Sequence, residues 1–210
     1  KNSNDVNPTG GHGTEVAGII GAIRDNGIGI SGVNQNVRLM PLVVLDSRGG
    51  GDSNSLNRAI RYAVDNGAEV INLSLSTAYL TSYSSTYDDS IKYAYDHNVL
   101  VVVAGGNGDI PLGNGFNLDL SPQSPVCNDG ESNMVIGVGA LTQDVKNRPR
   151  WSNYGQCVDV WAPGENIITT SDPNFTHSSL SIDGSGYYTK VDGTSFAAPI
   201  VTGVVSLLKA

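Results

Sequence analysis

Charge is scarce in this sequence, and long apolar runs are missing altogether. Only 15% of the 210 residues are charged, and acidic residues outnumber basic ones, so the formal net charge is -8. An acidic balance argues against nucleic acid or an anionic membrane surface as the main partner. No apolar run is long enough to span a bilayer, and no signal peptide is recognisable. We therefore expect no nucleic-acid partner and no membrane span, and we expect any targeting segment to have been removed or left out.

Cysteine is equally rare. Cys127 and Cys157 are the only two, which is too few for a zinc site. The pair forms either a disulfide or two free buried thiols. Each cysteine flanks an apolar run typical of a strand, which favours neighbouring positions, so we expect a disulfide. A disulfide and a low lysine content together indicate an exported protein, secreted or periplasmic.

Glycine, in contrast, is abundant, with 26 residues, and the loops are rich in serine and asparagine. This composition suits one loop-elaborated α/β domain and does not suit disorder. Hydrophobic periodicity predicts helices at residues 11–23, 53–66 and 88–98 and after Ser195, and strands at 37–45, 70–75, 99–104, 134–140 and 158–162. Strands that alternate with helices at this spacing predict a parallel, doubly wound sheet.

The most informative stretch is Asp-Gly-Thr-Ser-Phe-Ala-Ala-Pro at residues 192–199, which runs into an apolar segment ending at Leu208. A helix that is hydrophobic on nearly every side is buried. Ser195 would stand where that helix begins, beside N–H groups that have no intrahelical partner. Pro199 has no N–H and cannot bond back to the carbonyl of Ser195. Ser195 is therefore either an N-cap or a nucleophile beside an anion-stabilising helix end.

Two other segments place polar side chains in comparable settings. His12 lies between two glycines at the start of a second apolar helix, so it is either a structural histidine or a general base. Asn107 lies in Gly-Gly-Asn-Gly after an apolar strand, where it is either a turn former or an amide donor for an oxyanion. No glycine-rich loop has the spacing of a nucleotide-binding motif, which argues against a nucleotide-binding site.

Together these segments resemble the motifs of the subtilisin-like serine peptidases, the subtilases. Residues 11–18 resemble the histidine motif, residues 101–108 the segment of the oxyanion asparagine, and residues 193–199 the serine motif. The resemblance implies a three-layer α/β fold with a mostly parallel central sheet and helices on both faces. It also implies that Ser195 attacks the peptide carbonyl, that His12 acts as general base and acid, and that Asn107 holds the oxyanion.

The resemblance further implies how substrate binds. Two edge segments would clamp a polypeptide substrate as an extended strand, and a propeptide or inhibitor could bind in the same way. The residues assigned to substrate binding are Gly49, Gly50, Gly51, Ser74, Leu75, Ser76 and Gly106. No cofactor is expected for catalysis. Residues 25–30 resemble the calcium loop of the family, which makes Asn26 a candidate ligand of a structural calcium ion.

The sequence departs from the family pattern in one respect. The aspartate of the family lies in an Asp-Ser/Thr-Gly motif on a strand before the histidine, whereas Asp5 has neither that motif nor a strand. We therefore expect residues 1–210 to be a peptidase domain without the strand that carries the aspartate and without the C-terminal end. Two hypotheses follow: a serine endopeptidase, or a peptide- or partner-binding module with the same fold that is inactive because this chain lacks the aspartate.

Overall fold

The computed structural model describes residues 10–77, 83–109, 113–130, 132–174 and 185–209. A sheet of four parallel strands lies at its centre, and the strands follow one another across the sheet in chain order. These strands are β1 (Val70–Leu73), β2 (Leu100–Ala104), β3 (Val135–Leu141) and β4 (Val160–Pro163). Each was predicted to within two residues at either end, because the apolar runs that form them are short and bounded by turn residues.

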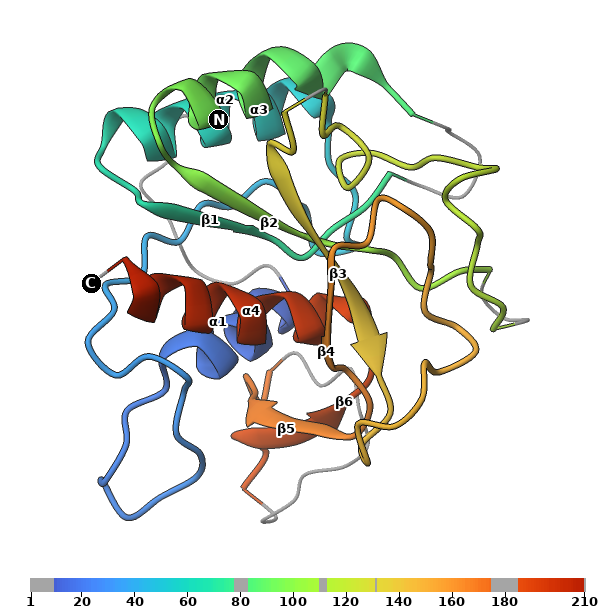
Figure 1. Ribbon diagram of the computed structural model, residues 1–210. Coiled ribbons are helices and arrows are strands. Elements are labelled where there is room, and N and C mark those ends of the chain that lie inside the picture. The colour runs from blue at the N-terminus through green and yellow to red at the C-terminus, as the bar shows by residue number, and fades with distance from the viewer. Residues whose placement is uncertain (1–9, 78–82, 110–112, 131, 175–184, 210) are drawn as a thin grey trace.

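Helices cover both faces of this sheet (Figure 1). On one face lie α2 (Ser53–Asp65), the short 3-10 turn η1 (Ser85–Tyr87) and α3 (Asp88–Asp96). On the other face α4 (Thr194–Leu208) packs against all four strands, and α1 (His12–Gly21) packs against α4. The expected three-layer α/β architecture with a parallel sheet is confirmed.

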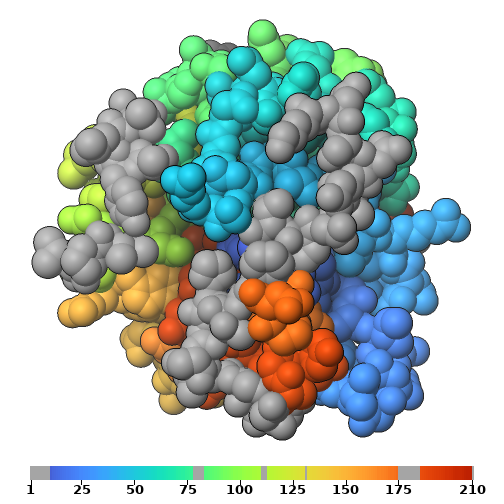
Figure 2. All heavy atoms as spheres, turned by 180° about the vertical axis from the view of Figure 1, so that it is seen from behind, coloured from blue at the N-terminus to red at the C-terminus, as the bar shows by residue number. Residues whose placement is uncertain are grey.

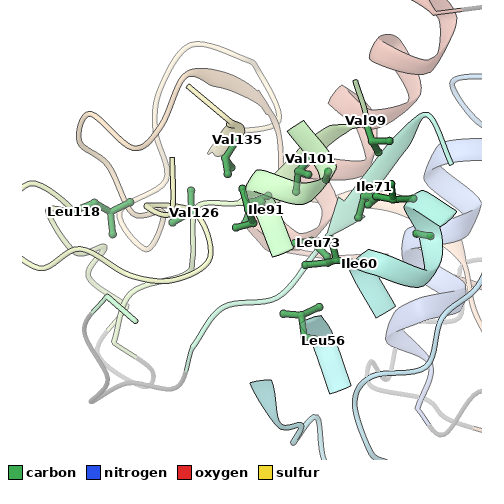
Figure 3. Close-up of a cluster of buried hydrophobic side chains, with 14 residues drawn as sticks. Leu56, Ile60, Ile71, Leu73, Ile91, Val99, Val101, Leu118, Val126 and Val135 are labelled. Carbon is green, nitrogen blue, oxygen red and sulfur yellow. The ribbon is translucent and has the colours of Figure 1, made fainter. Parts of the chain in front are cut away.

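The layers are held together by separate apolar clusters. The larger cluster joins α2 and α3 to the sheet, and Ile60 of α2, Ile91 of α3 and Val101 of β2 are among its buried members (Figure 3). A second cluster joins the opposite face of the sheet to Ala197 and Ala198 of α4. The alanines let α4 lie close to the strands, and this close packing fixes the start of α4 at the carboxyl edge of the sheet.

The predicted strand at residues 37–45 is not formed. The segment has no regular secondary structure, and Leu39 and Val43 within it are 45% and 50% exposed. A strand requires hydrogen bonds to a neighbouring strand. Within the part of the chain that the structure describes, no backbone hydrogen bond reaches residues 38–44. The apolar pattern is suited to a strand, but no described strand pairs with residues 38–44.

Two antiparallel strands were not predicted. They are β5 (Ile167–Thr170) and β6 (Tyr188–Val191), which pair in a small separate sheet. Each has only four residues, and its exposure alternates, so neither produces a recognisable apolar run. The hydroxyl groups of Thr169 and Thr170 donate to backbone carbonyls of α1, which fixes this sheet against the helix that begins at His12.

Two local predictions need correction, and α2 is capped from outside its predicted range. The N-cap of α2 is Asp52, whose carboxylate accepts the N–H of Ser55 at 3.0 Å. Ile23 lies beyond the end of α1 and is 73% exposed, because the helix stops at Gly21. Helix α4 is not buried on all sides, since Leu207 and Leu208 near its end are at least half exposed.

Candidate active site at the carboxyl edge of the sheet

Ser195 is the second residue of α4, and the N-cap of that helix is Gly193. Because Ser195 lies inside the helix and Gly193 is the N-cap, the interpretation of Ser195 as a simple N-cap is wrong. The Ser195 side chain is half-buried, and its Oγ lies 3.4 Å from the carbonyl oxygen of Ser74. Ser74 directly follows β1, so the candidate nucleophile lies at the carboxyl edge of the parallel sheet, where active sites of α/β proteins gather.

Asn107 lies at the same edge, three residues after β2. Its Oδ1 accepts two hydrogen bonds from Thr194, one from the backbone N–H and one from Oγ1, each 2.8 Å long. Its Nδ2 is on the side of the Gly193 turn, where a Cβ on Gly193 would come within 3.3 Å of it. The left-handed positions of this loop are taken by Gly106 and Gly108, not by Asn107. Asn107 is therefore not needed as a turn former, and its amide N–H group faces the start of α4.

His12 reaches this region from the third segment. It is the first residue of α1, and its ring packs against the ring of Phe196 with 5.5 Å between centroids. Phe196 is the residue after Ser195, so the histidine and serine segments adjoin in space although 183 positions separate the two residues in the sequence. The structure thus brings together the three segments that the sequence singled out.

The residues assigned to substrate binding divide into two groups. The loop containing Gly49, Gly50 and Gly51 and the segment containing Ser74, Leu75 and Ser76 line one large groove, which His12 also lines. Around residue 50 this loop lies at the surface, coloured cyan in Figure 2. Asp46 shapes the loop by accepting the N–H groups of Arg48 and Gly50, and the bond from Gly50 does most to lower the pKa of this carboxyl.

Gly106 has a different setting. It is buried, and a Cβ at this position would lie 2.4 Å from Nδ2 of Asn153. Its N–H donates to Oγ1 of Thr194 at 3.0 Å, and its carbonyl accepts the N–H of Asn153 at 2.9 Å. In this structure both backbone groups of Gly106 therefore hold the loop that carries Asn107.

The candidate calcium loop presents few side-chain oxygens that are available as calcium ligands. Oδ1 of Asn26 accepts the N–H of Ile28 at 3.2 Å, and Asp25 pairs with Arg24 at the surface. Across the described residues no group of three or more His, Cys, Asp or Glu side chains could hold a metal ion. Calcium binding at Asn26 stays a prediction.

The expected disulfide is present. Cys127 and Cys157 are bonded, with 5.1 Å between their Cα atoms. Both side chains pack against the apolar cluster beneath α2 and α3. The bridge ties the segment before β3 to the segment before β4, which steadies the half of the sheet that is remote from Ser74.

Sequence reasoning missed one member of the site. The sequence analysis named Thr194 only as part of a motif. Its hydroxyl accepts a hydrogen bond from the N–H of Gly106, and its backbone N–H and hydroxyl both donate to Oδ1 of Asn107. Thr194 is 1% exposed, and these contacts join two segments that are 87 residues apart. The only signal in the sequence was its place next to Ser195. Asp5, the carboxylate considered for His12, lies outside the described residues.

Comparison with known proteins is consistent with this geometry. The sequence profile of the Subtilase family matches residues 1–210. The chain is 37% identical over 207 residues to the thermophilic serine proteinase of Bacillus sp. (strain AK1), covering 98% of this chain and 44% of that protein. It is 36% identical to thermitase of Thermoactinomyces vulgaris, covering 98% of this chain and 64% of that protein.

Solved structures agree. A cold adapted subtilisin-like serine proteinase superposes with a TM-score of 0.76 at 28% identity, covering 99% of this chain and 64% of that one. A lanthipeptide protease gives a TM-score of 0.77 at 29% identity, covering 96% of this chain and 61% of that one. The chain thus spans less than two thirds of each of these proteins. A family match over the whole chain, together with the shared fold, shows that the chain belongs to the subtilase family of serine proteases.

Proposed function

We propose that the protein is a serine endopeptidase that cleaves peptide bonds through an acyl-enzyme on Ser195. Ser195 Oγ attacks the scissile carbonyl, and His12 takes its proton and later delivers it to the leaving amine. The amide of Asn107 and the backbone N–H of Ser195 hold the oxyanion. The observation that carries this proposal is that the segments of His12, Asn107 and Ser195 adjoin one another, with the His12 ring against Phe196 and Asn107 bonded to Thr194.

The contacts of Thr194 support the role of Asn107. An asparagine side chain has one accepting oxygen and one donating nitrogen. Thr194 engages the oxygen twice, so the nitrogen is the group left to face an anion near Ser195. An oxyanion donor has to be held in place before charge develops, and two hydrogen bonds to a buried threonine hold this one.

We further propose that a strand outside residues 1–210 fills the large groove and carries the aspartate that orients His12. The groove has a volume of about 1820 Å³ and lies between residues 37–45 and β1, with Leu56 and Ile60 of α2 also lining it. Strand β1 is the edge of its sheet. A strand inserted here would pair with β1 on one side and with residues 38–44 on the other, which would give that segment the strand structure that its pattern predicts.

This placement also serves the chemistry. His12 lines the same groove, so a strand in it passes the imidazole. A buried carboxylate at that point would fix the tautomer of His12 and stabilise the imidazolium that forms during attack. The carboxyl end of such a strand would lie with those of β1 and β2, next to Ser74 and Asn107.

The substrate we propose is a polypeptide bound as an extended strand between residues 49–51 and 74–76, which line the groove from two sides. A propeptide or protein inhibitor would use the same edges. The disulfide supports an exported protein, because such bonds persist in oxidising compartments. Among the described residues no helix has both the length and the apolar character to cross a membrane.

A fluorophosphonate probe, which reacts with activated serines, tests the proposal. We expect it to label Ser195 in the chain that includes its upstream strand, called the extended chain below. Ser195→Ala should abolish labelling. Ser206→Ala is a matched control, because Ser206 lies on the same helix and donates to the carbonyl of Gly203, away from Asn107. Labelling that persists in Ser195→Ala, or no labelling of the unsubstituted extended chain, would overturn the assignment.

A further inference from the structure

A proline inside α4 leaves the carbonyl of Ser195 without its usual helical donor. The N–H four residues after Ser195 would belong to Pro199, which has none. The carbonyl is instead bonded from outside the helix, where Oγ of Ser74 donates to it at 2.7 Å. Ser74 also holds the reacting side of the same residue, because its carbonyl oxygen lies 3.4 Å from Ser195 Oγ. One residue at the end of β1 thus contacts both the main chain and the side chain of the candidate nucleophile.

The direction of the Ser74 hydroxyl is set by two further side chains. Nδ2 of Asn72 donates to Oγ of Ser74 at 2.9 Å. Oγ1 of Thr202 lies 2.8 Å from Oδ1 of Asn72 and 3.0 Å from the carbonyl oxygen of Ala198, and its one proton goes to the nearer acceptor, Asn72. An amide nitrogen can only donate, so it leaves the single proton of Ser74 for the carbonyl of Ser195. With the Asn72 amide reversed, its oxygen would face Ser74 and take that proton, and the Ser195 carbonyl would lose this donor.

We propose that Thr202 and Asn72 are positioning residues for Ser195, acting through Ser74. The three side chains form a directed relay from Thr202 to Asn72 to Ser74 to the carbonyl of Ser195. Thr202 is 5% exposed and lies seven residues after Ser195, so it faces the sheet from the same side of α4. The relay connects the start of α4, where Ser195 lies, to the end of β1, where Ser74 is expected to bind substrate. Neither Thr202 nor Asn72 needs to touch the substrate.

The inference rests on the proposed function, and its test uses the rate constant of fluorophosphonate labelling at Ser195 in the extended chain. Thr202→Val keeps the β-branched shape and removes the donor to Asn72. We expect labelling to slow about tenfold, the rate equivalent of losing one hydrogen bond from the reacting arrangement. Thr202→Ser restores the hydroxyl and should bring the rate back to within about twofold of the unsubstituted chain.

A matched control separates positioning from general loss of stability. Ser90 of α3 makes the same kind of contact on the other face of the sheet, with Oγ 2.7 Å from Oδ1 of Asn57 and 3.0 Å from the carbonyl of Tyr87. Ser90→Ala should lower the melting temperature as Thr202→Val does, yet leave the labelling rate unchanged. If both substitutions slow labelling equally, Thr202 is only structural and the proposal fails.

A double-mutant cycle tests the path of the effect. If Thr202 acts through Ser74, Thr202→Val should add nothing to the slowing caused by Ser74→Ala. Full additivity of the two effects would overturn the relay.

If the unsubstituted extended chain is not labelled, the proposed function fails, but this result does not test the relay. In that case the carbonyl ¹³C resonance of Ser195 decides the relay. It should shift in Thr202→Val and in Ser74→Ala and stay in place in Ser90→Ala. No shift in Thr202→Val would overturn the proposal.

Discussion

Thr194 donates two hydrogen bonds to the same side-chain oxygen of Asn107. The backbone N–H and the hydroxyl of Thr194 both donate to Oδ1 of Asn107 at 2.8 Å. Thr194 is the residue before Ser195, so the proposed nucleophile and the proposed oxyanion donor are set by the same turn. Their relative position is fixed because the loop that carries Asn107 is hydrogen-bonded to the first residue of α4.

If Nδ2 of Asn107 binds the oxyanion, Asn107→Ala should lower kcat by about 10²–10³ and change KM little. That range is the one known for removing such a donor from subtilisin itself. Steady-state peptide hydrolysis by the extended chain measures both constants. An unchanged kcat would leave Asn107 with the structural role of bonding Thr194 and nothing more.

Thr194→Val should affect both stability and rate. The substitution removes the hydroxyl that accepts the buried N–H of Gly106 at 3.0 Å, and that N–H is left without this partner. We expect a loss of about 1–3 kcal/mol in the free energy of unfolding, measured by denaturant titration. The kcat should fall as well, because Asn107 keeps only the backbone bond, and Thr194→Ser should recover both. A stable Thr194→Val variant with full kcat would show that the hydroxyl contributes to neither.

The groove beside β1 leads to a prediction on the upstream strand. We expect residues 1–210 alone to hydrolyse peptides poorly or not at all and the extended chain to be active. Loss of the triad aspartate costs on the order of 10⁴ in kcat in serine proteases. A cleaved upstream segment that stays associated should also restore activity. Equal, high kcat for the short and extended chains would show that a carboxylate within residues 1–210, Asp5 first, already serves His12.

The carboxyl of Asp129 should make stability depend on pH. Burial raises its pKa most, and the nearby charge of Asp159 adds to this, against hydrogen bonds from the backbone N–H groups of Val135 and Met134. A raised pKa in the folded state means that the contribution of Asp129 is most favourable below its ordinary pKa and is lost as pH rises through the folded value. Asp129→Asn should therefore raise the melting temperature at neutral pH and give no gain at pH 3. An equal gain at both pH values would exclude titration as the cause.

The disulfide between Cys127 and Cys157 closes a loop with a sequence separation of 30 residues. Replacing both cysteines with serine should lower the free energy of unfolding by about 3–4 kcal/mol in the chain-entropy description. Denaturant unfolding of the variant and of the oxidised protein measures the difference. Alkylation of the denatured but unreduced exported protein is a separate check, and two reactive thiols would contradict the bond in the natural protein.

The sequence by itself determined the helices, the four strands of the parallel sheet and the candidate catalytic side chains, but not the small sheet of β5 and β6. Apolar runs of strand length, such as 99–104, needed no tertiary information, because residues buried on both faces of a parallel sheet are apolar without interruption. His12, Asn107 and Ser195 could be singled out because each stands in a glycine-rich turn beside a buried element. Pro199 even predicted that the carbonyl of Ser195 would lack a helical donor.

Only the tertiary structure decided which groups meet. That Ser74 supplies the missing donor, that Thr202 bonds to Asn72, and that Thr194 holds Asn107 are contacts across 87 to 130 sequence positions. Local pattern carries no information on such pairs, because they depend on how layers stack. The segment 37–45 shows the converse, since its pattern predicts a strand but strand formation requires a neighbour. Whether an apolar run becomes a strand is therefore decided by its pairing partner as well as by its own residues.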